Sequence, residues 1–372
     1  MSKYELSLNK DYVPDWTIVD AVRELFQNAL DQQTSVEGNT MFFDYDEPTQ
    51  TLKIGNKLSV LDPSTLLLGS STKRDDDKTI GQFGEGYKVA TLVLLKEGKN
   101  ITFYNYGRKE VWRPRFVKSR RYGTDILTFF TERYIWKSAP NNDLTILIEG
   151  ITQEEYGRIV DSNLHLSKVS RFIDTNYGRI LMEDKYKGRV FVNGLYVCEY
   201  APYHYGYDFK PSEIQLDRDR KLVSDFNLRW LASKMWAEPV EGNTEMVEVA
   251  ARLIANNAAD VAFVGDVYTY KSQVTDIAKT AYLAFKNEYG VNAVPVTSNY
   301  EMDGLSPSYK PIIVSEQLKK VLTQSPEYKE PERVVEPPFV DKVAHWLDVH
   351  GDTPSVEAIN ELRKLVEKER GY

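Results

Sequence analysis

The order of the first predicted elements constrains the fold of this chain more than any other feature. Residues 15–33 carry apolar side chains at helical spacing, with Asp15 as a candidate N-cap. The next segment, TMFFDYDEPTQTLKIGN, has the pattern of a strand, a turn at Glu47-Pro48 and a second strand. A β-hairpin directly after a first helix departs from the βαβ order of doubly wound folds, and it favours an α+β fold class.

The rest of the chain divides into segments of different composition. Strand patterns recur at NITFYNYG, ILTFFTERYIW and LTILIEGI, and GRVFVNGLYVCEY predicts a hairpin turning at Asn193-Gly194. Helical patterns dominate from about residue 222, and a last helix is expected after Thr353-Pro354. We therefore expect an N-terminal domain at 1–152, a second α+β domain at 153–238, a mainly helical domain at 239–324, a linker at 325–338 and C-terminal helices at 339–372.

Composition excludes several classes of protein. The chain has 372 residues, of which 42% are hydrophobic and 27% charged, as in folded proteins of two or three domains. Its formal net charge of -8 disfavours nucleic acid as a partner. Because Cys198 is the single cysteine, neither an internal disulfide nor a cysteine-based zinc cluster can form. The chain has no long apolar run and its first residues do not form a signal peptide, so we expect a cytoplasmic protein without a membrane partner.

The stretch RELFQNALD combines an apolar stripe with polar residues on one flank. At helical spacing Glu24, Asn28 and Asp31 cluster beside the stripe, where they would lie at the mouth of a pocket with the core as its floor. An ordinary surface helix has the same pattern. The stretch alone therefore leaves both interpretations open.

A glycine-rich stretch, GQFGEGYKVA, gives the second indication. Gly81, Gly84 and Gly86 lead into an apolar helix, and glycines there expose backbone N–H groups to which phosphate oxygens can bind. A simple reversal of the chain would also explain them. The spacing is not that of the dinucleotide fingerprint, and the residues after Gly86 are not those of a Walker A loop. Phosphate binding would need a different scheme.

Taken in order, these stretches resemble the GHKL ATPase superfamily, the Bergerat-fold group that includes gyrase, the ninety-kilodalton heat-shock chaperone, MutL and sensor histidine kinases. ELFQNALD is similar to its N box, GQFGEGYKVA to its second glycine box, SSTKR to part of its ATP lid, and the threonine of NNDLTILIEG to its late strand threonine. The resemblance covers about residues 10–150. It implies a Bergerat-fold α/β-sandwich ATPase domain, with ATP and Mg²⁺ as ligands.

The resemblance also implies a role for each matching residue. Glu24 would be the general base that activates water, and Asn28 would bind Mg²⁺ through its side-chain oxygen. The three glycines would surround the phosphates, with Lys73 of the lid as a further phosphate ligand. Thr145 would form a hydrogen bond near the adenine, whereas Asp31 is assigned to structure.

For Asn56 and Arg218, the sequence allows a structural role as well as the functional role that the resemblance implies. In the family, the first glycine box contains an aspartate and two glycines, but LKIGNKLSVLDP offers only Asn56. The amide of Asn56 could bind the adenine, or the residue could simply lie at the end of a strand.

GRVFVNGLYV resembles strand pairs of the transducer domain that follows the ATPase domain in the family. IQLDRDRKLV is similar to the chaperone segment whose arginine reaches the γ-phosphate, which implies Arg218 as a catalytic residue. Arg218 could equally pair with a neighbouring aspartate.

These expectations combine into one main function and two alternatives. The main function is Mg²⁺-dependent ATP binding and slow hydrolysis that drive a conformational switch or homodimerisation, acting on a protein partner or client. An alternative is a non-hydrolysing nucleotide-binding module that binds a protein partner. DNA-strand handling is disfavoured by the charge, and histidine phosphotransfer is disfavoured because none of the four histidines lies beside the expected acidic partner.

Overall fold

The computed structural model divides the chain into two compact units. Unit 1 contains Met1–Val240 and Ala258–Ala262, and unit 2 contains Glu241–Asn257 and Phe263–Tyr372. The structure describes residues 1–67, 86–121, 123–136, 138, 140–214, 224–238, 244–268, 275–333, 337–350 and 355–370. No helix of these described residues is both long enough and apolar enough to cross a membrane.

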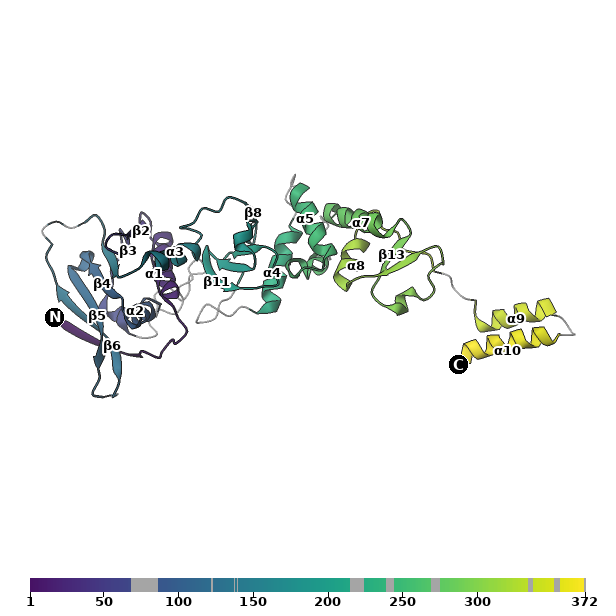
Figure 1. The fold of residues 1–372 in the computed structure, drawn as a ribbon, viewed down its shortest axis with the longest axis horizontal. Coiled ribbons are helices and arrows are strands. Elements are labelled where there is room, and N and C mark those ends of the chain that lie inside the picture. Colours follow the sequence, from purple (N-terminus) through teal and green to yellow (C-terminus); the bar gives the residue numbers. More distant parts are fainter. Residues whose placement is uncertain are drawn as a thin grey trace. The chain divides into compact units, whose positions relative to one another are not determined.

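The first part of unit 1 is built on a seven-stranded antiparallel sheet (Figure 1). Its strands lie in the order β1-β6-β5-β4-β7-β3-β2. The bounds in that order are Ser2–Asn9, Asp125–Arg133, Glu110–Lys118, Asn100–Asn105, Leu144–Glu149, Thr51–Asn56 and Met41–Asp46. The predicted hairpin after the first helix is β2–β3, which forms one edge of the sheet.

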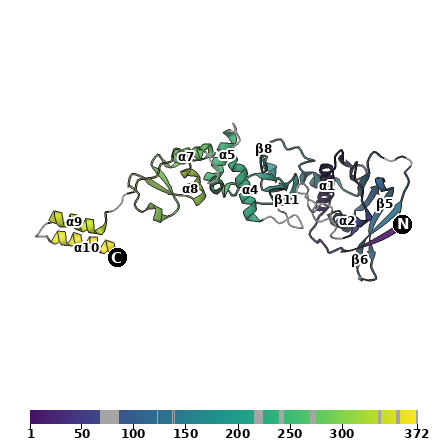
Figure 2. The same ribbon diagram turned by 180° about the vertical axis from the view of Figure 1, so that it is seen from behind.

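Helices α1 (Ile18–Ser35) and α2 (Gly86–Lys96) pack against one face of this sheet, as Figures 1 and 2 show. Alternate residues of the strands, among them Leu52, Ile54 and Ile146, join apolar residues of both helices in one core. Strand side chains alternate between faces, so this core fixes which residues of each strand face the helices. Helix α3 (Gln153–Asp161) packs beside α1.

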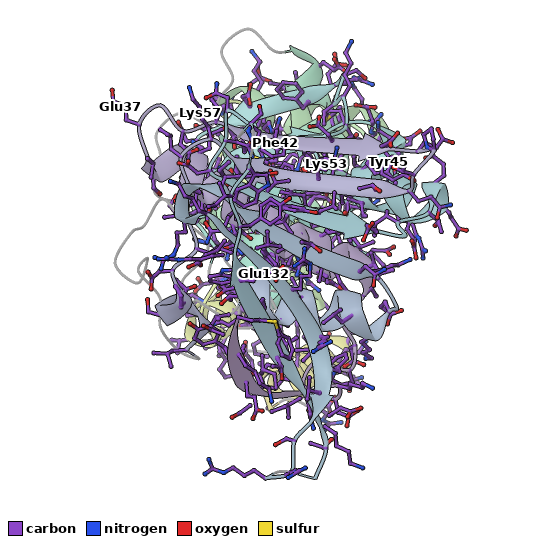
Figure 3. All side chains as sticks on the ribbon, turned by 90° about the vertical axis from the view of Figure 1, so that its left-hand side faces the viewer. Glu37, Phe42, Tyr45, Lys53, Lys57 and Glu132 are labelled. Carbon is purple, nitrogen blue, oxygen red and sulfur yellow. The ribbon has the colours of Figure 1, made fainter. Side chains whose placement is uncertain are left out.

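The other face of the sheet carries polar and aromatic side chains. Figure 3 looks onto this face, where Phe42, Lys53 and Glu132 are labelled. Phe42 of β2 lies opposite Gly55 of β3, which in turn lies opposite Thr145 of β7. Residues directly opposite in an antiparallel pair project to the same side, so all three belong to this open face.

A second sheet of unit 1 has five strands in the order β11-β10-β12-β9-β8. Their bounds in that order are Leu195–Glu199, Arg189–Val192, Gly206–Phe209, Gly178–Leu181 and Phe172–Thr175. Asn193 and Gly194 turn the β10–β11 hairpin with φ values of 51° and 76°, which confirms the predicted turn. Helix α4 (Asp225–Ala237) follows this sheet, and its Trp236 donates a hydrogen bond to the Tyr207 hydroxyl at 2.7 Å.

Unit 2 is mainly helical. Its elements are α5 (Thr244–Ala255), α6 (Val264–Tyr268), α7 (Thr275–Tyr289), β13 (Ala293–Val296), β14 (Lys310–Ile313), α8 (Glu316–Thr323), α9 (Phe339–His350) and α10 (Val356–Arg370). The parallel pair β13–β14 is its small sheet, and α5 packs against α7. Trp346 of α9 donates to the Ala358 carbonyl of α10 at 2.9 Å, which ties the last two helices together.

The expected α+β fold class is confirmed by the packed helices and by sheets in which most strand pairs are antiparallel, with β10–β12 and β13–β14 as parallel pairs. The N-cap of the first helix, in contrast, is Thr17 rather than Asp15. The Thr17 side chain accepts from the Asp20 backbone N–H at 3.4 Å, and the Asp20 carboxylate accepts from the Thr17 N–H at 2.9 Å. This capping box uses two reciprocal bonds that Asp15 cannot make from its position.

Candidate functional site

Five of the nine expected site residues lie in the part of the chain that the structure describes: Glu24, Asn28, Asn56, Gly86 and Thr145. Lys73, Gly81 and Gly84 fall within residues 68–85, and Arg218 falls within residues 215–223, both outside the described residues. The site is therefore built from α1, α2 and the strands beneath them.

Glu24, Asn28 and Gly86 lie together where α1 meets the start of α2. Glu24 is only 2% exposed, and Asn28, one turn later, is half-buried. A methyl group built on Gly86 would lie 2.6 Å from Glu24 Oε2 and 3.4 Å from Asn28 Nδ2. Because 2.6 Å is closer than a real Cβ contact, any side chain at this position would displace the Glu24 carboxylate. Three residues singled out from two distant stretches of sequence therefore form one group.

The first turn of α2 also contributes a positive electrostatic potential to this group of residues. Gly86 is the first described residue of α2, and the N–H groups in the first turn of a helix carry its partial positive charge. Such a helix end attracts phosphate and carboxylate groups. Carboxylate, amide and helix N-terminus together are suited to a phosphorylated ligand with a cation.

Lys88, two residues into α2, is fully buried and was not expected in the site. Its Nζ donates to the backbone carbonyls of Thr65 at 2.8 Å and Leu67 at 2.7 Å. Tyr87 adds a hydrogen bond of 2.9 Å between its hydroxyl and Thr65 Oγ1, and burial raises the pKa of this hydroxyl above its usual value. The short helix at Pro63–Leu66 is thereby fixed to the first turn of α2. A lysine within the apolar run YKVATLVLL was the available signal in the sequence.

Asn56 ends β3 with its side chain on the helix side of the sheet, in step with Leu52 and Ile54. It is 2% exposed, and its Nδ2 donates to the Ala29 carbonyl of α1 at 2.9 Å. No described residue donates a hydrogen bond to its Oδ1. The bond to Ala29 fixes the orientation of the amide, which leaves a carbonyl oxygen and one N–H for another partner.

Two other buried asparagines hold the chain that follows Asn56. Asn39 donates to the carbonyl of Leu58 at 3.2 Å and accepts from its N–H at 2.9 Å. Asn105 does the same for Leu61, with distances of 2.7 and 3.4 Å. These side chains fix the segment that follows β3.

Thr145 is separated from the group at α1 and α2. It projects from the open face of the sheet with Gly55, whereas Asn56 projects from the helix face. Its Oγ1 accepts from Asn142 Nδ2 at 2.6 Å. Leu144, the neighbour of Thr145, belongs to the core and lies opposite both Asn56 and Asn105 on the adjacent strands. On the helix face of β7, the residue beside Asn56 is therefore the apolar Leu144.

Metal binding at the group would rely on few protein ligands. Within the described ranges, no cluster of three or more His, Cys, Asp or Glu side chains could hold a metal ion. Asn28 and Glu24 supply oxygen atoms, the ligand type that Mg²⁺ prefers. Mg²⁺ usually keeps several waters and uses the phosphates of a nucleotide as its other ligands. The residues present fit such a partly hydrated ion.

Comparisons with known proteins find a family model and an uncharacterised relative that this chain is similar to. The family model described as the Mycoplasma pneumoniae MPN635 N-terminal domain matches residues 154–235, which include the second sheet. An uncharacterised protein of Mycoplasma pneumoniae is 25% identical over 234 residues, which cover 59% of this chain and 91% of that protein.

Solved structures show a weaker likeness. The ATPase region of Saccharomyces cerevisiae topoisomerase II bound to ICRF-187 has a TM-score of 0.33 and 11% identity, covering 48% of this chain and 62% of that chain. The ATPase and transducer domains of DNA topoisomerase II from Balamuthia mandrillaris have a TM-score of 0.31 and 13% identity, covering 48% and 60%. This chain thus spans less than two thirds of the topoisomerase chains that it matches.

Proposed function

We propose that this chain binds ATP with Mg²⁺ between α1 and the start of α2 and hydrolyses it slowly, so that the nucleotide drives a change of conformation or of dimerisation. The observation that carries the proposal is the close approach of Gly86 to Glu24 and Asn28, whose side-chain atoms lie 2.6 and 3.4 Å from the position that a Cβ on Gly86 would take. A buried carboxylate and an amide therefore lie beside the first described turn of α2. These are the groups that a triphosphate, its cation and an attacking water require.

Glu24 acts as the general base in this proposal. Its carboxylate accepts a proton from water while the water oxygen bonds to the γ-phosphorus and the bond to the ADP oxygen breaks. ADP and phosphate leave, and the proton on Glu24 returns to solvent. A carboxylate within hydrogen-bond reach of the water is sufficient for this role.

Asn28 holds Mg²⁺ through its side-chain oxygen, with phosphate oxygens and waters as the other ligands. The cation supplies charge neutralisation to the triphosphate. Lys73, Gly81, Gly84 and Arg218 remain proposed phosphate ligands on the strength of the sequence alone. Thr145 is not part of the proposal because it lies on the open face of the sheet.

Asn56 recognises the base in this proposal. Its Oδ1 accepts a hydrogen bond from the adenine N6 amino group, and the remaining N–H of Nδ2 donates to N1. ITP has an oxygen in place of the amino group. Its C6 oxygen and Asn56 Oδ1 are both hydrogen-bond acceptors, so they would repel each other.

We expect ATP to bind at least about tenfold more tightly than ITP, because a buried site built for a donor rejects an analogue that lacks it. Competition titration of both nucleotides measures the ratio. Asn56→Leu should reduce the preference to near unity, and Ser59→Ala, which removes a neighbouring contact of Asn39, should retain it. Equal affinities in the wild type would exclude this role of Asn56.

Gly86→Ala tests the contact itself. The added methyl group would lie 2.6 Å from Glu24 Oε2, so the carboxylate must move. We expect the hydrolysis rate to fall by about tenfold or more, as for other displaced catalytic groups. Gly157→Ala on α3 is the matched control, since a methyl group there meets nothing within 4 Å. Equal rates for the two variants would argue against a functional contact at Gly86.

A non-hydrolysing nucleotide-binding module is the second candidate. It is motivated by the first glycine box, where Asn56 stands in place of the aspartate and two glycines of the resembled family. The two candidates differ in product: chromatography of ATP incubated with the purified chain should show ADP that is absent with Glu24→Ala. Saturable binding with no ADP above background would select the module.

A further inference from the structure

Arg23, the residue before Glu24, is a buried cation with unused donors. Its side chain is 6% exposed, yet Nε and Nη2 have no hydrogen-bond partner in the part of the chain that the structure describes. Leaving donors of a buried guanidinium unpaired is costly, and native structures rarely do so without a reason. A second position of the side chain, in which these donors are used, would supply that reason.

The contacts of Arg23 connect α1 with the second sheet. Its Nη1 donates to the backbone carbonyl of Tyr196 in β11 at 3.2 Å and lies 3.3 Å from Asp20 Oδ1. Its Nη2 lies 3.7 Å from Glu24 Oε1, close enough for an ion pair but too far for a hydrogen bond. The guanidinium thus lies between the proposed base and β11.

The β10–β11 hairpin is held near α1 by the segment after α3. The Tyr196 N–H donates to the Ser162 carbonyl at 2.9 Å, and His165 Nε2 donates to the Asn193 carbonyl at 2.7 Å. The His165 ring in turn contacts the Phe26 ring of α1, with centroids 5.7 Å apart. Displacement of this hairpin would move the Tyr196 carbonyl away from Arg23.

We propose that Arg23 is a positioning residue through which the β10–β11 hairpin controls Glu24. With the hairpin in place, the Tyr196 carbonyl keeps Arg23 Nη2 at 3.7 Å from Glu24 Oε1, beyond hydrogen-bond distance, and the carboxylate can accept a proton from water. When the hairpin moves, the guanidinium turns further onto Glu24, and its Nε and Nη2 donate hydrogen bonds to both carboxylate oxygens in the fork geometry that arginine favours. A carboxylate that accepts two such charge-assisted hydrogen bonds is a poorer proton acceptor. The inference rests on the proposed function of Glu24 and adds regulation of that site by the second sheet.

A double-mutant cycle tests this coupling. Gly194→Ala displaces the hairpin turn, because the methyl group would lie 2.7 Å from His165 Nε2 and the residue has a φ of 76°. We expect Gly194→Ala to lower kcat about fivefold with KM unchanged in an otherwise wild-type chain, but less than about twofold in an Arg23→Met background. His165→Ala, which removes the hydrogen bond to the Asn193 carbonyl of the hairpin and the ring contact with Phe26 of α1, provides a second perturbation if Gly194→Ala does not fold.

Arg189→Met is the matched control background. Arg189 also donates to a backbone carbonyl, that of Asp161 at 2.9 Å, but it is not adjacent to Glu24. The fivefold effect of Gly194→Ala should persist there. Equal effects of Gly194→Ala in the wild-type and Arg23→Met backgrounds would overturn the coupling while leaving the proposed function intact. Hydrolysis unaffected by Glu24→Ala would overturn both.

Discussion

Replacing Glu24 with glutamine should lower the rate of ATP hydrolysis by about 100-fold or more while changing the affinity for ATP by less than about threefold. Glutamine has nearly the shape of glutamate and fits the contact with Gly86, but it cannot accept a proton from water. The loss therefore falls on the chemical step and leaves binding in place. A single-turnover assay of phosphate release, combined with a binding titration of the same protein, separates the two quantities.

Glu154→Gln is the matched control for this prediction. Glu154 lies on α3 with its side chain 85% exposed, so the same loss of one negative charge occurs far from buried groups. Its rate should equal that of the wild type. If Glu24→Gln hydrolyses ATP as fast as Glu154→Gln, Glu24 is not the base.

Replacing Lys88 with methionine should lower the free energy of unfolding by about 3 kcal/mol. Methionine fills much of the same space, but the carbonyls of Thr65 and Leu67 lose the charged donor that satisfies them in the interior. Each unsatisfied buried group costs about 1–3 kcal/mol, and the gain from burying a thioether offsets only part of it. Urea denaturation of both proteins measures the difference.

Lys96→Met provides the comparison on the same helix. Lys96 also donates to a backbone carbonyl, that of Pro14 at 3.2 Å, but its side chain is exposed and water can replace the bond. We expect a change below about 1 kcal/mol. Equal stabilities of the wild type and Lys88→Met would show that the two carbonyls do not depend on the lysine.

Local sequence patterns predicted the elements of the site well. The first helix and the β2–β3 hairpin follow from periodicity and turn residues, and the Asn193-Gly194 turn follows from its need for positive φ. The side-by-side position of Glu24 and Asn28 follows from helical spacing alone. These features depend on neighbours within a few residues, which is the range over which sequence patterns are informative.

Other features depend on contacts between distant segments, and sequence patterns carry little information on them. The face of the sheet that Thr145 occupies changes with a shift of a single residue, because strand side chains alternate. The burial of Arg23 results from β11, which is more than 170 residues away along the chain. The role of Lys88 depends on two carbonyls that approach it only in the folded protein. Gly86 belonged to a recognisable glycine pattern, but its contact with Glu24 required the packing of α2 on α1.

The central claim is that MgATP binds to the group formed by Glu24, Asn28 and Gly86. Isothermal titration of ATP into the purified chain, with Mg²⁺ and with EDTA in its place, tests it most directly. We predict saturable binding of one ATP per chain in the presence of Mg²⁺, weaker binding with EDTA, and the same weak binding for Asn28→Leu under both conditions. The absence of saturable binding to the wild type with Mg²⁺ would contradict the claim.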